Sequence, residues 1–121
     1  MRGDHNYEKV PSPHRIRIST FGDSFTHGDG VYNHETWQEK LNSLHHKLEV
    51  LNFGVPGFGL DQAFLRFQHD GIEFTSNIVF IGFMSADIRR GVNTYRPFAL
   101  AHTGLPLSKP RFIIEDDQLV L

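Results

Sequence analysis

The hydrophobic positions of this chain fall into short blocks that alternate between strand-like and helix-like spacing. Residues 15–21, with Ile16, Ile18 and Phe21, and the short segment 50–53 have strand-like spacing. Residues 78–84 form an unbroken apolar run, as in a parallel strand covered on both faces. Between these runs, residues 34–48 and the segment that starts at Leu60 carry apolar side chains at helical spacing. This βαβαβ order predicts a doubly wound parallel α/β sheet with right-handed crossovers.

Each of the two predicted helices presents one apolar stripe, spaced so that its members lie on the same side. In residues 34–48 the stripe consists of Trp37, Leu41, Leu44 and Leu48. In the second helix it consists of Leu60, Phe64 and Phe67. We expect Asn33 to cap the first helix, with Glu35 in its first turn, and Gly71 to end the second.

The two ends of the chain differ in character from this alternating middle. Residues 1–14 are polar and contain two prolines, which predicts a loose lead-in. At the other end, residues 111–114 and 118–121 are apolar and flank a polar turn at 115–117, a pattern typical of a β-hairpin. A length of 121 residues is near the commonest domain size, so we expect a single domain over 1–121.

Composition excludes several classes of function. A formal net charge of −2 leaves no basic footprint for nucleic acid or for an anionic membrane surface. The absence of cysteine excludes disulfides, thiolate metal sites and a cysteine nucleophile. No apolar run approaches the roughly 20 residues of a membrane-spanning helix, and the polar start lacks the apolar part of a secretory signal. We therefore expect a cytoplasmic protein that uses no metal or organic cofactor.

Ser24 is the first candidate for chemistry. It follows the first predicted strand by a few residues, and Gly22, Gly28 and Gly30 around it permit a sharp turn before the next helix. A strand, a tight turn and a helix together lift a side chain clear of the carboxyl edge of an open α/β sheet. A serine hydroxyl displayed there can act as a nucleophile if a base takes its proton. The alternative is a serine that only forms the turn or caps the helix.

The ends of the next two strands supply further candidates. Gly54 closes the second strand, and its loop should open beside Ser24, where a backbone N–H can stabilise an oxyanion by about 3 kcal/mol. Alternatively, the glycine merely permits the turn. After the third strand, Asp87 with Arg89 and Arg90 could bind an anion, but we expect these residues to form a solvated first turn of helix.

These three strand ends together resemble the SGNH (GDSL-type) hydrolase family. The resemblance covers residues 15–100 and lies in Gly22-Asp23-Ser24-Phe25-Thr26, in Asn52-Phe53-Gly54 and in the glycine-led end of the third strand. It implies a flavodoxin-like α/β/α sandwich that hydrolyses acyl or acetyl esters, here truncated to about three parallel strands plus the C-terminal hairpin. It also implies that Ser24 is the nucleophile and that the N–H groups of Ser24 and Gly54 are oxyanion-hole donors.

Two features depart from the family pattern. Ala86 stands where the family has an asparagine that is a third oxyanion donor, and losing one donor lowers turnover by about 10²- to 10³-fold. The chain also lacks the Asp-x-x-His block that supplies the family's general base. The candidate bases here are His27 and His34, whose alternative is a loop or capping role, and, from a second subunit, His69 or His102.

The resemblance also implies that the outer edge of the third strand pairs with a fourth, which this chain lacks. Residues 78–84 would then present a bare apolar edge, and such edges pair with other chains. Either the C-terminal hairpin covers this edge or the protein assembles with itself. We expect a homo-oligomer that pairs through the third-strand edge.

The sequence therefore predicts a serine carboxylester hydrolase that acts on a small acyl ester. The first alternative is a catalytically silent SGNH-like fragment that folds and self-associates without turnover. A third hypothesis is a phosphate-binding module built on the glycine loop. It is the weakest, because the loop lacks the Gly-Lys-Ser/Thr ending of a P-loop and the dinucleotide glycine fingerprint.

Overall fold

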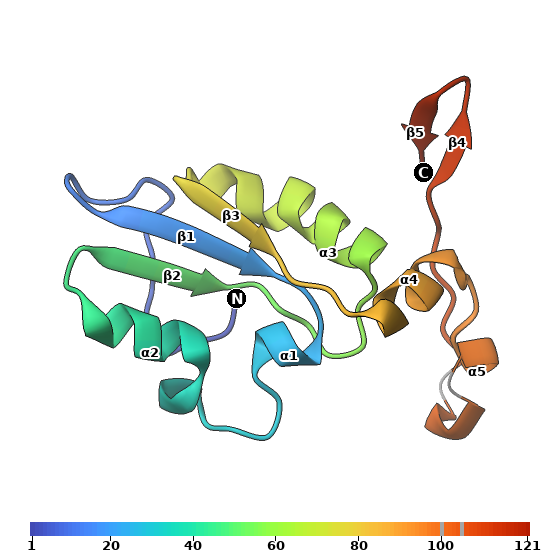
Figure 1. The fold of residues 1–121 in the computed structure, drawn as a ribbon, viewed down its shortest axis with the longest axis horizontal. Helices are drawn as coiled ribbons and strands as arrows, with labels where there is room; N and C mark the ends of the chain where they lie inside the picture. The colour runs from blue at the N-terminus through green and yellow to red at the C-terminus, as the bar shows by residue number, and fades with distance from the viewer. Residues whose placement is uncertain (100, 105) are drawn as a thin grey trace.

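A computed structural model of the chain describes residues 1–99, 101–104 and 106–121. Its centre is a parallel sheet of three strands in the order β2-β1-β3, with β1 at Ile16–Phe21, β2 at Leu48–Asn52 and β3 at Ile78–Ile81 (Figure 1). The central strand β1 pairs in parallel with both neighbours. The predicted α/β class and the adjacency of the first two strands are confirmed.

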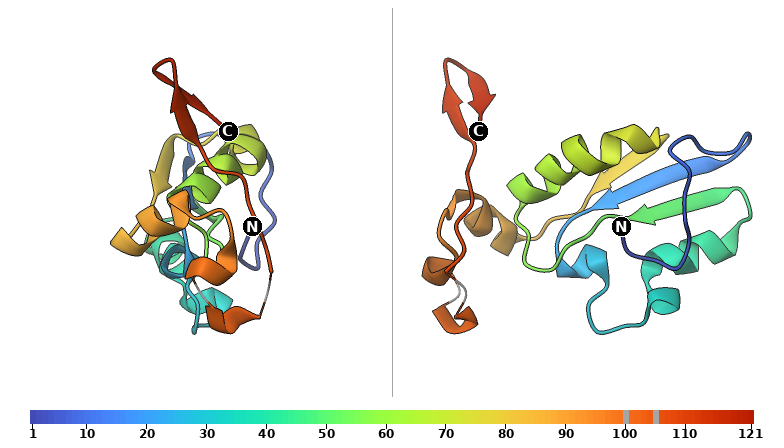
Figure 2. Two further views of the ribbon diagram at one scale, coloured as in Figure 1. Left: turned by 90° about the vertical axis from the view of Figure 1, so that its right-hand side faces the viewer. Right: turned by 180° about the vertical axis from the view of Figure 1, so that it is seen from behind.

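Helices and turns connect the strands on both faces of the sheet. Between β1 and β2 lie α1 (Ser24–His27), a 3-10 turn (Asn33–Glu35) and α2 (Trp37–Leu44). Between β2 and β3 lie α3 (Leu60–Arg66), a π-helical turn (Phe67–Gly71) and a 3-10 turn (Ile72–Phe74). After β3 come α4 (Ser85–Val92), α5 (Arg96–Ala99) and a 3-10 turn (Ala101–Thr103). Figures 1 and 2 show α2 on one face of the sheet and α3 on the other, which makes three layers.

The hydrophobic core lies between the sheet and the α3 layer. Phe21 at the end of β1 is fully buried and stacks on Phe53, with ring centroids 4.8 Å apart. Phe67 meets the same Phe21 ring edge-on at 5.5 Å. Leu51 and Ala63 complete the buried cluster. Burial of each large side chain contributes about 1.5–3 kcal/mol, so these aromatic contacts hold the sheet to the second crossover.

The expectation that Gly71 ends the second helix is wrong. Gly71 has a φ of −95°, and the helical turns continue to Phe74, where Thr75 takes the left-handed conformation with a φ of 49°. The glycine serves packing instead, because a Cβ at this position would lie 2.7 Å or less from atoms of the Phe21 ring. Absence of a side chain lets the backbone lie against the central core residue.

The first predicted helix is shorter than residues 34–48. α2 begins at Trp37, and Thr36 is its cap, with the hydroxyl oxygen accepting from the N–H of Glu39 at 3.4 Å. Asn33 is not the cap of this helix, because its side chain is occupied by Arg2 and Asp4. The helix ends at Leu44, and the chain turns back into β2 from Leu48.

The apolar stripes of the two helices are also not the most buried positions. In α2 the buried residue is Gln38, whose side-chain amide donates to the carbonyl of Thr26 at 2.6 Å and to the Thr20 hydroxyl at 3.1 Å. Leu44, expected on the buried stripe, is 75% exposed. In α3 the buried residue is Ala63. The hydrogen bonds of Gln38 to Thr20 and Thr26 therefore take the place of part of the apolar packing predicted for this helix.

The N-terminal segment 1–14 contains no regular helix, but it is attached to the body more firmly than expected. The backbone N–H of Arg2 donates to the carbonyl of Asn52 at the end of β2, at 2.8 Å. Arg17 on β1 is 1% exposed and holds the segment from inside the fold. Its guanidinium donates to the carbonyls of Glu8, Lys9 and Phe74 and to the carboxylate of Glu49.

The C-terminal hairpin is confirmed and does not cover the sheet. β4 (Ile113–Glu115) and β5 (Gln118–Val120) pair with each other in a separate antiparallel ribbon. Figure 1 shows this ribbon standing apart from β3. The third strand ends at Ile81 rather than Met84, and Phe80 on it is 52% exposed, so coverage on both faces is not found.

Substitution of Gly71 tests the packing of the core. Gly71→Ala places a methyl group against the Phe21 ring, and overpacking of this kind costs about 1–3 kcal/mol of unfolding free energy. Urea unfolding followed by circular dichroism measures the loss. Gly91→Ala in α4 is the matched control, since a Cβ there would lie 3.8 Å from an Asp61 carboxylate oxygen, an ordinary van der Waals contact, and alanine favours helix. Equal stability of the two variants would contradict this account of the core.

Candidate active site

The turn after β1 is built on Gly22. Its φ of +155° lies in a region that other residues rarely adopt. A Cβ on Gly22 would collide with the Thr26 side chain of α1 and lie 2.7 Å from the carbonyl oxygen of Gly82 after β3. The N–H of Val55 donates to the carbonyl of Gly22 at 2.9 Å. All three strand ends therefore meet at this glycine, as the sequence predicts.

Ser24 follows this turn as the first residue of α1. Asp23 precedes it as the helix cap, buried, with one carboxylate oxygen accepting from the N–H of Phe25 at 2.9 Å. Ser24 itself is partly exposed. Its hydroxyl forms no hydrogen bond with any described residue, so it is free to meet a ligand at the carboxyl edge of the sheet. Its role as nucleophile stays a prediction.

Gly54 packs directly against α1, as close approach to the serine turn requires. A Cβ on Gly54 would lie within 3 Å of backbone atoms of Thr26 and His27. Its N–H, however, donates to the side-chain oxygen of Asn52 at 3.0 Å, and the Asn52 amide in turn donates to the carbonyl of His27 at 3.1 Å. For Gly54 to serve an oxyanion, the Asn52 side chain has to release this N–H.

The residues after β3 form an ion-pair network rather than a solvated turn. Asp87 is 1% exposed and accepts from the N–H of Met84 at 2.9 Å and from Arg90 at 2.6 Å. Arg90 also reaches Asp23 at 3.3 Å and the carbonyl of Phe58 at 3.2 Å. One guanidinium thus connects the loops that follow all three strands.

This arrangement corrects the expectation that Asp87 and Arg90 form a solvated first turn of helix, and it connects Arg90 to Asp23, a contact that sequence reasoning did not predict. Two buried carboxylates need a cation, and the guanidinium supplies it together with hydrogen bonds. The i,i+3 spacing of Asp87 and Arg90 was the available signal. The contact to Asp23 carried no signal, because 67 residues separate it from Arg90. Ala86, in the same turn, offers no side-chain donor.

None of the candidate histidines is hydrogen-bonded to Ser24 within the described residues. The Nδ1 atom of His27 lies 2.7 Å from a carboxylate oxygen of Asp29 and 3.1 Å from the guanidinium of Arg2. His34 is exposed and stacks on the Tyr32 ring with centroids 5.9 Å apart.

His69 and His102 are exposed as well. They stand on the π-helical turn after α3 and on the 3-10 turn after α5. The identity of the general base stays a prediction for all four histidines.

The described residues contain no group of three or more His, Asp or Glu side chains placed to hold a metal ion. Over the same residues, no helix is both long and apolar enough to cross a membrane.

Comparison with known proteins relates the fold to esterases. No protein-family model and no curated protein matches the sequence. Two solved structures match: AlinE4, described as an SGNH-hydrolase family esterase, and the D162A mutant of esterase AlinE4. Each superposes with a TM-score of 0.53 at 20% sequence identity, over 69% of this chain and 47% of that chain. The chain therefore spans about half the length of these structures.

At 20% sequence identity, the similarity to these two structures is evidence for a shared fold only. Over the matched part the chain shares the α/β fold of these structures, with a flavodoxin-like order of three parallel strands and a separate antiparallel pair. This confirms the predicted fold class.

Removal of the Arg90 guanidinium tests the ion-pair network that joins Arg90 to Asp23 and Asp87. Arg90→Met leaves Asp23 and Asp87 buried without a cation, which costs about 3 kcal/mol of unfolding free energy. Chemical denaturation measures the change. Arg89→Met is the matched control, because Arg89 is exposed and should alter stability by less than about 0.5 kcal/mol. If the two variants unfold at the same denaturant concentration, the ion-pair network does not stabilise the site.

Proposed function

We propose that the protein is a carboxylester hydrolase that uses Ser24 as its nucleophile. The observation that carries this proposal is the position of Ser24, with an uncommitted hydroxyl, where the ends of three parallel strands converge. The esterase names of the two fold neighbours support the same class of reaction. The substrate is a small acyl ester, and the reaction needs no cofactor.

The reaction proceeds through an acyl-enzyme. The Ser24 oxygen attacks the ester carbonyl, a base accepts the hydroxyl proton, and the alcohol leaves with a proton returned to it. Water then attacks the acyl-serine and releases the carboxylic acid. The N–H groups of Ser24 and Gly54 stabilise the tetrahedral oxyanion once Asn52 has released Gly54.

Slow turnover is expected for this chain. Ala86 supplies no third oxyanion donor, and one missing donor costs about 10²- to 10³-fold in rate. In addition, no histidine of the described residues accepts a hydrogen bond from the Ser24 hydroxyl. These two observations favour the second candidate function, a catalytically silent α/β domain that folds and self-associates.

Self-association follows from the open edge of β3. Ile78, Val79 and Phe80 are 38–52% exposed, and no charge stands between Ile78 and Ile81 to prevent pairing with an identical strand. Since the hairpin leaves this edge uncovered, we propose that a second copy of the chain covers it. The second copy also brings its own His69 and His102 into the assembly, where either can serve as base.

Hydrolysis of p-nitrophenyl acetate separates the two functions. The wild-type protein should release p-nitrophenol faster than buffer, and Ser24→Ala should return the rate to background. Ser43→Ala on α2 is the matched control and should retain the wild-type rate. Covalent labelling of Ser24 by a fluorophosphonate is the more sensitive measurement. Equal hydrolysis by wild type and Ser24→Ala, or none by either, contradicts the hydrolase proposal.

Light scattering at micromolar concentration tests the assembly. We expect a wild-type dimer and a monomeric Val79→Lys, since a lysine on an edge strand blocks strand pairing. Ile114→Lys on the exposed hairpin is the control and should stay dimeric. A monomeric wild-type protein contradicts the proposal. If only Ile114→Lys dissociates the dimer, the interface lies on the hairpin and not on β3.

A further inference from the structure

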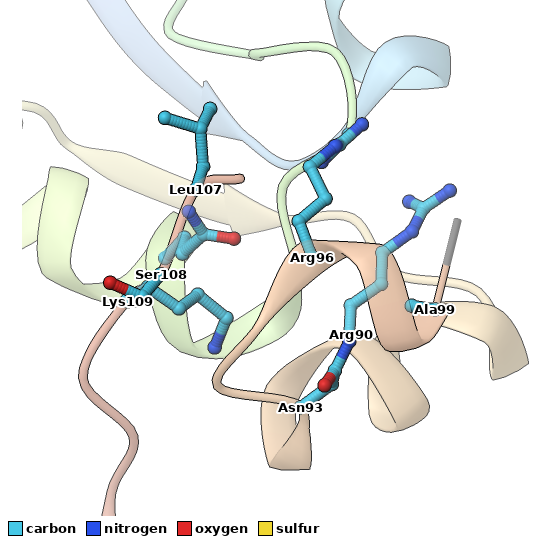
Figure 3. Close-up of a pocket in the computed structure, with 9 residues that line it drawn as sticks. Arg90, Asn93, Arg96, Ala99, Leu107, Ser108 and Lys109 are labelled. Carbon is cyan, nitrogen blue, oxygen red and sulfur yellow. The ribbon is translucent and has the colours of Figure 1, made fainter. Parts of the chain in front are cut away.

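A small cavity opens between α4, α5 and the loop after β2. It has a volume of about 200 Å³. Three cations line it, together with polar side chains; the polar and charged members are Gln62, Arg90, Asn93, Arg96, Ser108 and Lys109. Figure 3 labels all of these side chains except Gln62. No carboxylate belongs to the described lining, which contains several hydrogen-bond donors.

The three cationic side chains differ in whether a carboxylate of the protein already forms an ion pair with them. Lys109 pairs with Asp61 and also donates to the carbonyl of Gly91. Arg90 pairs with Asp23 and Asp87, and each of these contacts uses its Nη1 atom. Its Nε and Nη2 atoms have no partner among the described residues.

Arg96 is the uncompensated cation of the cavity. No carboxylate of the described residues lies within ion-pair distance of its guanidinium, although its backbone N–H is fixed by the carbonyl of Leu107 at 2.9 Å. A guanidinium offers five N–H donors in a planar fork that matches a carboxylate or phosphate. The cavity therefore holds a positive charge that lacks a protein anion.

The loop after β2 is shaped to admit this guanidinium. Gly57 has a φ of +81°, and a Cβ built on it would lie 2.9 Å from an Nη atom of Arg96. The guanidinium consequently rests on the backbone of the same loop that carries Gly54. In Figure 3, the side chains of Arg90 and Arg96 extend to the same side of the cavity.

Arg90 connects the cavity to the proposed nucleophile. It lines the cavity and also contacts Asp23, the residue directly before Ser24. A ligand group bound at the arginines is thus held next to the turn that displays the serine hydroxyl. A volume of about 200 Å³ admits a compact group of a few atoms.

We propose that this cavity binds an oxyanion, a carboxylate or a phosphate, carried by the substrate of Ser24. Arg96 supplies the main contact as a bidentate donor and the uncompensated charge, and the Nε and Nη2 groups of Arg90, which have no partner among the described residues, are further hydrogen-bond donors. The substrate class is then an acyl ester that bears a second, anionic group. The assignment of this anion to an ester substrate rests on the proposed function; the binding of the anion itself does not.

Direct binding measurements test the site without any reaction. In calorimetry with succinate and with inorganic phosphate, the wild-type protein should bind at least one anion, and the tighter one identifies the source of the oxyanion. Arg96→Gln should weaken that binding at least tenfold, Arg96→Lys less, and Ser24→Ala should leave it unchanged. Lys40→Gln is the control, since it removes one exposed positive charge outside the cavity.

Either of two results would contradict the anion site. Either the wild-type protein binds neither anion, or Arg96→Gln and Lys40→Gln bind alike. Chemical denaturation of each variant shows whether it is folded under the conditions of the titration. If Arg96→Gln is unfolded, Arg96→Lys decides, because it keeps the charge and loses the planar fork.

A pair of esters tests the link to Ser24. The wild-type protein should hydrolyse the mono-p-nitrophenyl ester of succinate with a higher kcat/KM than p-nitrophenyl acetate. Arg96→Gln should lose that preference while retaining acetate hydrolysis, and Ser24→Ala should lose both activities. Equal losses on both esters in Arg96→Gln overturn the substrate assignment. If Ser24→Ala hydrolyses both esters normally, the proposed function fails and the anion site stands on the binding data alone.

Discussion

Close contact between backbones at the carboxyl edge of the sheet is the constraint on which the rest of this structure depends. Gly22 and Gly54 both lie where a Cβ would strike α1, so the helix that begins with Ser24 can sit directly over two strand ends. Close backbone contact therefore positions the serine, and two buried side chains hold α1 in place. The Asp23 carboxylate caps it, and the Gln38 amide donates to the carbonyl of Thr26.

The second organising contact is electrostatic. The segments that follow the three parallel strands lie at one edge of the sheet, and Arg90 joins them by reaching Asp23, Asp87 and the carbonyl of Phe58. A guanidinium suits this position, because it forms several directed hydrogen bonds while it balances buried carboxylates. Packing of Phe21 with Phe53 fixes the sheet layer, whereas Arg90 fixes the loops that surround the candidate nucleophile.

Much of the fold could be predicted from the sequence, because the apolar runs and the glycines at their ends carry it. Strand positions, the adjacency of the Ser24 and Gly54 loops and the C-terminal hairpin follow from local pattern. The helix limits did not follow from the apolar spacing, because the cap of α2 is a local hydrogen bond between Thr36 and Glu39, and because the buried Gln38 acts through tertiary hydrogen bonds. The linking role of Arg90 was not predicted for a similar reason: its partner Asp23 is 67 residues away in the chain, and Asp87 with Arg89 and Arg90 is a pattern typical of a solvated first turn of helix.

The two outer strands of the sheet face different surroundings. At Asn52 the end of β2 already accepts a backbone N–H from Arg2, and the N-terminal segment runs beside it, whereas β3 has no such neighbour among the described residues. A fibre needs two free strand edges per molecule, and here a bridge to Arg2 obstructs the carboxyl end of one of them. If a second copy pairs with β3 as proposed above, one isologous contact uses the fully open edge, and a closed pair is then expected rather than a fibre.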